Sequence, residues 1–217
     1  MFEYSELKTR QREIRDAFPT ALSLRTHRAL SWLHRAEQET EDEDARFLFL
    51  WIAFNAAYAN EAYDGGDLSE RAVFNQFLQR LVDGDPERLL NKIVWQQFSG
   101  SIRLLINNEY VFQPFWRFQA GLISEAEWKE QFATSKAAAN RALGHMDTAK
   151  VMGITFDRLY TLRNQIVHGG ATWNGGVNRA QMRDGTNLMG QLVPVVIYLM
   201  MENHHQVWGD PCYPVVD

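Results

Sequence analysis

The sequence contains a single cysteine, Cys212, among 217 residues. One thiol cannot form an internal disulfide framework, and a reducing cytoplasm is the simplest location for such a chain. The sequence does not open with a basic segment followed by an apolar one, so we expect no signal peptide. The apolar runs are broken by polar residues well before they reach the length of a bilayer span. These absences predict a cytoplasmic protein that has no membrane partner.

The sequence also lacks an excess of basic charge. It has 22 Lys and Arg residues against 27 Asp and Glu residues, which gives a formal net charge of −5 at pH 7. This balance argues against a broad, non-specific surface for nucleic acid, although it leaves a local basic site open. The apolar fraction of 46% and the charged fraction of 23% are those of a folded globular protein. The length suits one large domain, which we expect to span residues 1–217.

Patterns typical of β-strands are scarce. Apolar residues instead recur at helical spacing along most of the chain. This spacing and the turn residues predict helices over 5–18, 19–40, 46–60, 68–82, 89–106, 111–120, 124–143, 148–168 and 181–203. We therefore expect an all-α helical bundle with a helical insertion at about 64–123 and an irregular tail over 204–217.

The segment FLFLWIAFNAAY is the strongest candidate for the centre of the core. Its large apolar residues form a stripe along one helical face, with further apolar residues beside it: Phe47, Leu50, Trp51, Phe54 and Tyr58. The acidic run at 41–44 precedes it and suits the positive end of a helix dipole. Further along the chain, Ser124 and Glu127 have the spacing of a capping box. Pro194 is expected to kink the last helix.

Several familiar catalytic motifs are missing. The sequence contains no P-loop, no GxGxxG and no GxSxG pattern. His204 and His205 are adjacent, so their side chains diverge by about 100° on a helix, and with Asp210 and Cys212 they match no zinc-binding spacing. Cys212 has no evident base in its neighbourhood, which argues against a catalytic thiol. We expect no metal and no other cofactor.

The segment LYTLRNQIVHGG, Leu159 to Gly170, ends an apolar helical pattern with polar residues of catalytic type. Asn164 and His168 are four residues apart and share a helical face. Arg163 lies about 140° around the axis from His168, but its long side chain can turn toward that face. Spacing alone leaves two interpretations open. The segment is either an ordinary helix end closed by a glycine, or a functional site.

The surrounding segment reverses the acidic character of the chain. Residues 158–183 contain the arginines 158, 163, 179 and 183 and no Asp or Glu. The same stretch carries Trp173, Asn174 and two glycine pairs. Backbone amides, guanidinium groups and an aromatic face are the groups that hold a phosphodiester and a stacked base. Trp173, Arg179 and Arg183 are therefore candidates for contact with RNA.

Arg163 to His168, RNQIVH, resembles the R-x(4–6)-H signature of the HEPN superfamily, in which a polar residue such as Asn commonly follows the Arg. The segment lies at the end of a long late helix, where that family places its motif. The flanking LYTLRNQIVHGGATW and the helix FLFLWIAFNAAYAN also look like bacterial HEPN-domain proteins. The resemblance covers residues 22–58 and 148–203, and it leaves the middle of the chain unmatched.

The resemblance implies a HEPN-like helical bundle that forms a homodimer with two motifs facing each other. Many members of the family are metal-independent endoribonucleases, and the setting implied is stress, toxin action or phage defence. By this likeness His168 is the acid or base, Arg163 holds the phosphate, and Asn164 orients the imidazole or the 2′-hydroxyl. DNA is not expected to be cleaved, because it lacks the 2′-hydroxyl.

One position departs from the family. HEPN toxins that are paired with a nucleotidyltransferase often have a Tyr two residues after the His, and Gly170 stands there in this chain. That form of control is therefore not expected, and a regulatory protein partner, if there is one, is not identified by the sequence. The alternative is a non-catalytic binding or regulatory module of the same fold, since some members of the family only bind or act as scaffolds.

Overall fold

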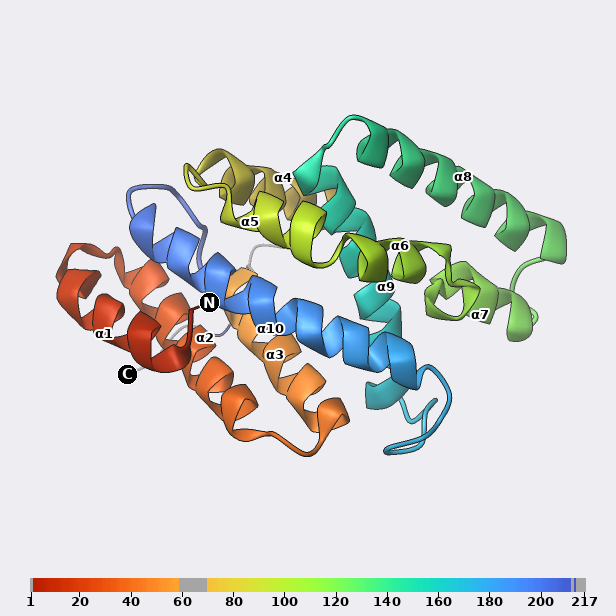
Figure 1. Cartoon of the computed structure of the whole chain (residues 1–217), viewed down its shortest axis with the longest axis horizontal. Helices are drawn as coiled ribbons and strands as arrows, with labels where there is room; N and C mark the ends of the chain where they lie inside the picture. The colour runs from red at the N-terminus through yellow and green to blue at the C-terminus, as the bar shows by residue number, and fades with distance from the viewer. Residues whose placement is uncertain (1, 59–69, 212, 214–217) are drawn as a thin grey trace. The chain divides into compact units, whose positions relative to one another are not determined.

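The computed structural model describes residues 2–58, 70–211 and 213, and these residues form helices and no β-strand (Figure 1). The all-α prediction is confirmed. The chain divides into two compact units, one made of Met1–Leu90 with Thr186–Asp217 and the other of Asn91–Gly185. A single domain over 1–217 and an insertion at 64–123 stay predictions, because two compact units can belong to one domain. None of the helices in the described ranges combines the length and apolarity that a bilayer crossing requires.

Among the described residues, the main elements of the first unit are helices α1 to α4 and most of the last helix of the chain. They are α1 (Tyr4–Ile14), α2 (Thr20–Gln38), α3 (Glu43–Tyr58), α4 (Glu70–Asp83) and α10 (Arg179–Glu202). A single 3-10 turn at Arg15–Ala17 ends the first helical segment, which was predicted to continue to residue 18. Pro19 stands at the N-cap of α2, so the predicted boundary there is confirmed.

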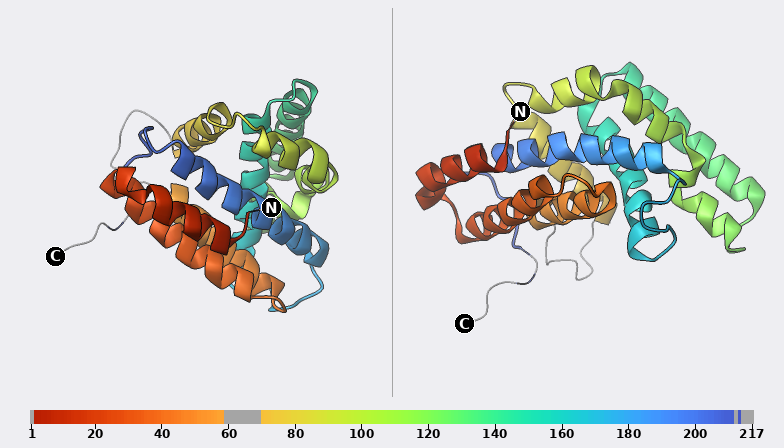
Figure 2. Two further views of the ribbon diagram at one scale, coloured as in Figure 1. Left: turned by 60° about the vertical axis from the view of Figure 1, so that its left-hand side comes forward. Right: turned by 60° about the horizontal axis from the view of Figure 1, so that its bottom comes forward.

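Helices α2 and α3 form an antiparallel hairpin at the centre of this unit, and the views in Figure 2 keep them side by side. The predicted stripe on α3 is confirmed, since Phe47, Leu50, Trp51 and Phe54 are all buried and Tyr58 is half-buried. Burial of each large apolar side chain contributes about 1.5–3 kcal/mol relative to exposure. The predicted start of this helix in the acidic run is also confirmed, because α3 begins at Glu43.

A buried arginine of the first unit was not foreseen from the sequence. Arg25 is 0% exposed, and its guanidinium lies among backbone carbonyls. Nη1 donates to the carbonyl of Ala57 at 2.8 Å, in the last turn of α3. Nε donates to the carbonyl of Gly209 at 3.1 Å, and Nη2 donates to that of Asp210 at 2.7 Å. Arg25 therefore satisfies a helix end and ties the segment after α10 to α2.

The second unit is also helical. Its elements are the end of α5 (Leu89–Lys92), a π-helical turn (Ile93–Gln97), α6 (Ser99–Asn107), a 3-10 turn (Glu109–Val111), α7 (Gln113–Gln119), α8 (Glu125–Gly144), α9 (Thr148–Val167) and the start of α10.

The prediction of a single helix over 89–106 is wrong. A π turn, closed by the Phe98 amide on the Ile93 carbonyl at 3.0 Å, interrupts it. Such a turn adds one residue and changes the phase of the helix. Trp95, within this turn, donates through Nε1 to Thr148 Oγ1 at 2.9 Å.

The predicted start of α8 is confirmed in detail. Ser124 Oγ accepts from the Glu127 amide at 3.2 Å, and Glu127 Oε2 accepts from the Ser124 amide at 2.7 Å. These hydrogen bonds from Ser124 lower the pKa of the Glu127 carboxyl below its usual value. The next helix, α9, starts with Asp147, whose Oδ1 accepts from the Lys150 amide at 2.9 Å. Helix α9 is buried along most of its length, so it is the central helix of the second unit.

Candidate functional site at the carboxyl end of α9

Helix α9 ends at the predicted polar segment. His168 is its C-cap residue, and the His168 amide donates to the carbonyl of Asn164 at 3.0 Å. Gly169 follows with a φ of +69°, which confirms the left-handed glycine expected at this end. The chain then folds back, because the Ala171 amide donates to the carbonyl of Gln165 at 2.9 Å. A Cβ at Gly170 would lie 3.3 Å from that carbonyl oxygen, so the close approach favours glycine.

Arg163 and Asn164 form a pair at this helix end. Arg163 Nη1 donates to Asn164 Oδ1 at 2.8 Å. The guanidinium carbon of Arg163 also lies 5.8 Å from the centre of the Tyr160 ring. Arg163 therefore turns toward the neighbour that shares a helical face with His168, as its length allows. Both side chains are half-buried, which restricts their conformations.

His168 differs from this pair in its exposure. Its side chain is exposed, and among the described residues its imidazole has no hydrogen-bond partner. The ring is thus accessible to a molecule from outside the chain.

Gln165 was not identified as a site residue by the sequence, but it holds the site together. Its Nε2 donates to the carbonyl of Tyr110 at 2.7 Å, and its Oε1 accepts from Asn178 Nδ2 at 3.0 Å. The side chain thereby connects α9 to the 3-10 turn at Glu109–Val111 and to the loop that follows His168. Tyr110 is 55 positions away in sequence, so no local pattern could have indicated this contact.

The loop between α9 and α10 carries the predicted RNA-contact residues. Trp173 is 75% exposed. Arg179 is half-buried, and its Nε donates to the carbonyl of Gly175 at 3.1 Å, so part of this side chain supports its own loop. Arg183 is exposed on the first turns of α10. A Cβ at Gly175 would lie 2.5 Å from Thr172 Oγ1, and this turn therefore requires a glycine.

One of the four arginines counted in this segment does not belong to the surface. Arg158 is 2% exposed on the buried side of α9. Its guanidinium carbon lies 4.4 Å from the centre of the Phe112 ring, and Nη2 donates to Ser135 Oγ at 2.9 Å. Arg158 therefore fastens α9 to neighbouring elements of the second unit. The local basic surface is smaller than the sequence indicated, and it consists of Arg163, Arg179 and Arg183.

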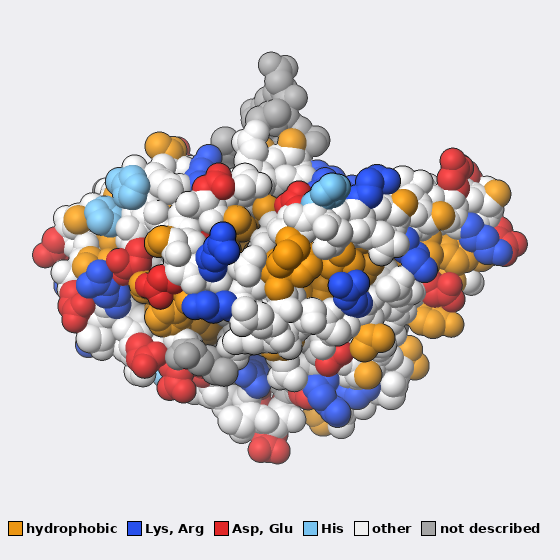
Figure 3. All heavy atoms as spheres, turned by 45° about the horizontal axis from the view of Figure 1, so that its top comes forward, with side chains coloured by type: hydrophobic (Ala, Val, Ile, Leu, Met, Phe, Trp, Pro, Cys, Tyr) orange, Lys and Arg blue, Asp and Glu red, His pale blue; other side chains and the backbone are white. Residues whose placement is uncertain are grey.

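The wider surface has mixed charge. On the face drawn in Figure 3, Lys and Arg side chains alternate with Asp and Glu, and apolar side chains lie between them. This mixture agrees with the acidic net charge of the chain. A ligand that binds through charge must therefore use a local cluster.

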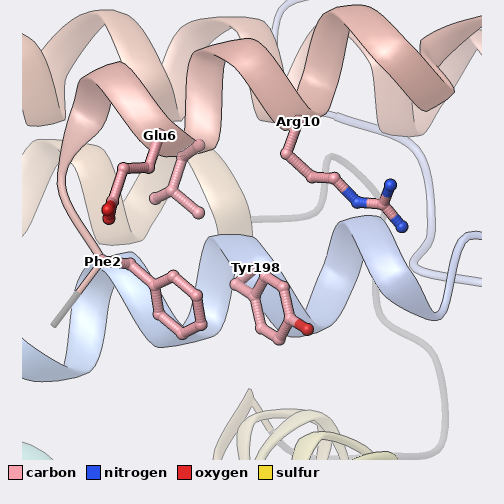
Figure 4. Close-up of a pocket in the computed structure, with 5 residues that line it drawn as sticks. Phe2, Glu6, Arg10 and Tyr198 are labelled. Carbon is pink, nitrogen blue, oxygen red and sulfur yellow. The ribbon is translucent and has the colours of Figure 1, made fainter.

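A hollow in the first unit has a structural explanation. Phe2, Glu6, Leu7, Arg10 and Tyr198 line it, and Figure 4 shows the Phe2 ring beside the Tyr198 ring. The Phe2 ring stacks on Tyr198 with centres 4.3 Å apart, and Arg10 makes two hydrogen bonds to Glu202, from Nε at 2.7 Å and Nη2 at 3.0 Å. Burial raises the pKa of Tyr198, which keeps its hydroxyl protonated. These contacts join α1 to α10.

The described residues contain no group of three or more His, Cys, Asp or Glu side chains arranged to hold a metal ion. Comparison of the chain with protein-family models, curated proteins and solved structures finds no match. The function must therefore be inferred from the residues of the chain and their geometry.

Proposed function

We propose that this chain is a metal-independent endoribonuclease that acts as a homodimer and cleaves RNA through the 2′-hydroxyl of the RNA itself. The observation that carries the proposal is the arrangement at the end of α9. There the imidazole of His168 is exposed and has no hydrogen-bond partner among the described residues. Shortly before it in the chain, the Arg163 guanidinium donates to the side-chain amide of Asn164. A HEPN-like fold, and a setting in stress, toxin action or phage defence, are proposed from the resemblance of the motif alone.

The reaction needs groups of these kinds. A base removes the proton of the 2′-hydroxyl, the 2′-oxygen forms a bond to phosphorus, and the bond from phosphorus to the 5′-oxygen breaks as an acid protonates that oxygen. Positive charge stabilises the pentacovalent intermediate. In this proposal His168 transfers protons, Arg163 binds the phosphate oxygens, and Asn164 holds the guanidinium in place and orients the imidazole or the 2′-hydroxyl. The products are a 2′,3′-cyclic phosphate and a 5′-hydroxyl.

A second copy of the chain completes the proposed site. One imidazole cannot act as base and acid in the same step, whereas two His168 side chains related by a two-fold axis can divide these tasks. The pair of Arg163 side chains would double the positive charge at the phosphate. Trp173, 75% exposed beside this site, offers a ring on which a base can stack. Arg179 and Arg183 are proposed to contact neighbouring phosphates.

A non-catalytic binding or regulatory module is the second candidate. It is favoured by the local geometry, because His168 is also an ordinary C-cap residue and Arg163 is engaged by its neighbour Asn164 within one chain. In that case the same surface would bind RNA or a protein without cutting it. The two candidates differ in whether removal of the imidazole abolishes a chemical step.

The deciding experiment incubates the chain with a single-stranded RNA of mixed sequence in EDTA and measures the cleavage rate. The variant His168→Ala should cleave about 10²–10⁴-fold more slowly, since that is the usual contribution of general acid–base catalysis. His145→Ala is a matched control, because His145 is the exposed C-cap residue of α8 and its amide donates to the carbonyl of Arg141 at 3.0 Å. The control should cleave like the unmodified chain, and DNA of the same sequence should stay intact.

Two results would contradict the proposal. One is equal RNA cleavage by the unmodified chain and by folded His168→Ala. The other is an absence of cleavage on every RNA tested combined with RNA binding that both variants retain, which would favour the binding module.

A further inference from the structure

A second hollow lies in the first unit and is lined by residues of α1, of the beginning of α2 and of the segment after α10. It is a cavity of about 600 Å³, which is the size of a small-molecule site. Helix α1 contributes Lys8 and Arg15, α2 contributes His27, and the segment after α10 closes it with Asp210 and Pro211. All of these residues belong to the first unit, so the cavity is separate from the end of α9.

The walls of this cavity carry uncompensated positive charge. Among the described residues, the Lys8 ammonium donates a hydrogen bond to a neutral group, Gln11 Oε1, at 2.7 Å. Arg15 lies 3.9 Å from the fully exposed carboxylate of Asp16, a distance at which an exposed pair neutralises little charge. Burial, and then repulsion from Arg12 and Arg15, lower the pKa of Lys8. An anion placed here would relieve that repulsion.

The cavity also offers neutral hydrogen-bond donors. The hydroxyl-bearing residues Thr20 and Ser23 line it, and Thr20 and Ala21 are the first residues of α2. No side chain caps this helix, whose N-cap residue is Pro19, so the first backbone amides are not satisfied by a capping group. Gln11, 3% exposed, lies deeper and donates through Nε2 to Thr26 Oγ1 at 3.3 Å.

The remaining lining limits the class of ligand. Leu24 and Pro211 provide apolar surface, and Asp210 is the one carboxylate of the lining. The charges of Lys8 and Arg15 exceed that of Asp210 even when His27 is neutral. Cations, hydroxyls and an apolar wall within a small volume suit a compact phosphorylated molecule with an apolar portion. A polynucleotide would need a longer basic track.

We propose that this cavity binds a small phosphorylated ligand, with Lys8, Arg15 and the start of α2 holding its phosphate. The binding site is independent of the proposed cleavage site at His168, because it uses other helices and other side chains. Its occupancy would stabilise the first unit by holding α1, α2 and the segment after α10 around one anion.

Titration calorimetry of the full chain with inorganic pyrophosphate, at constant ionic strength, tests this proposal. The unmodified chain should bind pyrophosphate. The double variant Lys8→Ala/Arg15→Ala should bind it more weakly, with a dissociation constant that rises about tenfold or more for each charge-assisted contact that is lost. The control Lys92→Ala/Arg103→Ala removes two exposed cations of the second unit and should bind like the unmodified chain. Lys8→Gln, which keeps a long polar side chain, serves as a second variant if the double variant does not fold.

Pyrophosphate binding that is unchanged in folded Lys8→Ala/Arg15→Ala or in Lys8→Gln would overturn the proposal. So would an unmodified chain that shows no more binding heat than with sodium chloride of the same ionic strength. Neither result bears on RNA cleavage, since the two sites share no residue.

Discussion

At the scale of single residues, two buried arginines, Arg25 and Arg158, connect segments that are distant in the sequence, although the chain as a whole is acidic. Arg25 bonds to the carbonyls of Ala57, Gly209 and Asp210, and one of its partners is 185 positions away. A guanidinium has several donors in a fixed geometry, so one side chain can satisfy carbonyl groups from different segments. Arg158 connects segments of the second unit in a different way, through the ring of Phe112 and the hydroxyl of Ser135. Nothing local in the sequence separates these arginines from exposed ones, and this is why sequence reasoning counted Arg158 with the surface.

Substitution of Arg25 should therefore destabilise the first unit strongly. Arg25→Met keeps the length of the side chain but removes every donor, and each carbonyl that stays buried without a partner costs about 1–3 kcal/mol. The free energy of unfolding in urea measures the loss. Arg28→Met is the comparison, since Arg28 is only half-buried and its Nη2 donates to the carbonyl of the exposed residue Tyr213 at 2.6 Å. A loss for Arg25→Met no larger than for Arg28→Met would show that the buried hydrogen bonds do not stabilise the fold.

At the scale of helices, the sequence predicts elements well where the signal is local. The start of α8 at Ser124 and the end of α9 at Gly169 follow from capping rules that involve only neighbouring residues. The π turn closed at Phe98 does not, because tertiary contacts, and not neighbouring residues, decide where a helix takes up an extra residue. The candidate site divides in the same way. Arg163, Asn164 and His168 form a local sequence motif. The hydrogen bond from Gln165, in contrast, depends on Tyr110, which is distant in the sequence.

The glycine that ends α9 gives a prediction at this scale. Gly169→Ala places a Cβ on a residue with a φ of +69°, which costs about 1–2 kcal/mol for an L-residue. The strain should also shift His168 and lower the proposed RNA cleavage more than stability alone explains. Thermal unfolding and cleavage rates measured on the same variant separate these two effects. Gly144→Ala is the matched control, because Gly144 is the last residue of α8 and a Cβ there meets nothing within 4 Å. Equal behaviour of the two variants would contradict the role given to Gly169.

At the scale of the whole molecule, the proposed chemistry requires two chains. Exposed apolar side chains lie close to the motif in the sequence, since Tyr160 and Val167 are each 50% exposed and Trp173 and Val177 are 75% and 81% exposed. Apolar side chains of this kind are typical of surfaces that another molecule covers. We expect a second copy of the chain to cover part of this surface and to bring its own His168 to the same phosphate.

A site shared by two chains makes activity depend on protein concentration. The rate of RNA cleavage per chain should stay constant while dimers predominate and fall on dilution below the dissociation constant of the dimer, because an isolated chain has one imidazole for two proton transfers. Sedimentation velocity over the same concentrations gives the fraction of dimer. Mixing His168→Ala with the unmodified chain should lower the rate beyond simple dilution, since each mixed dimer lacks one of the two imidazoles. A rate per chain that is constant across the range where sedimentation shows dissociation would mean that a single chain cleaves alone, and the division of acid and base between two copies of His168 would then be wrong.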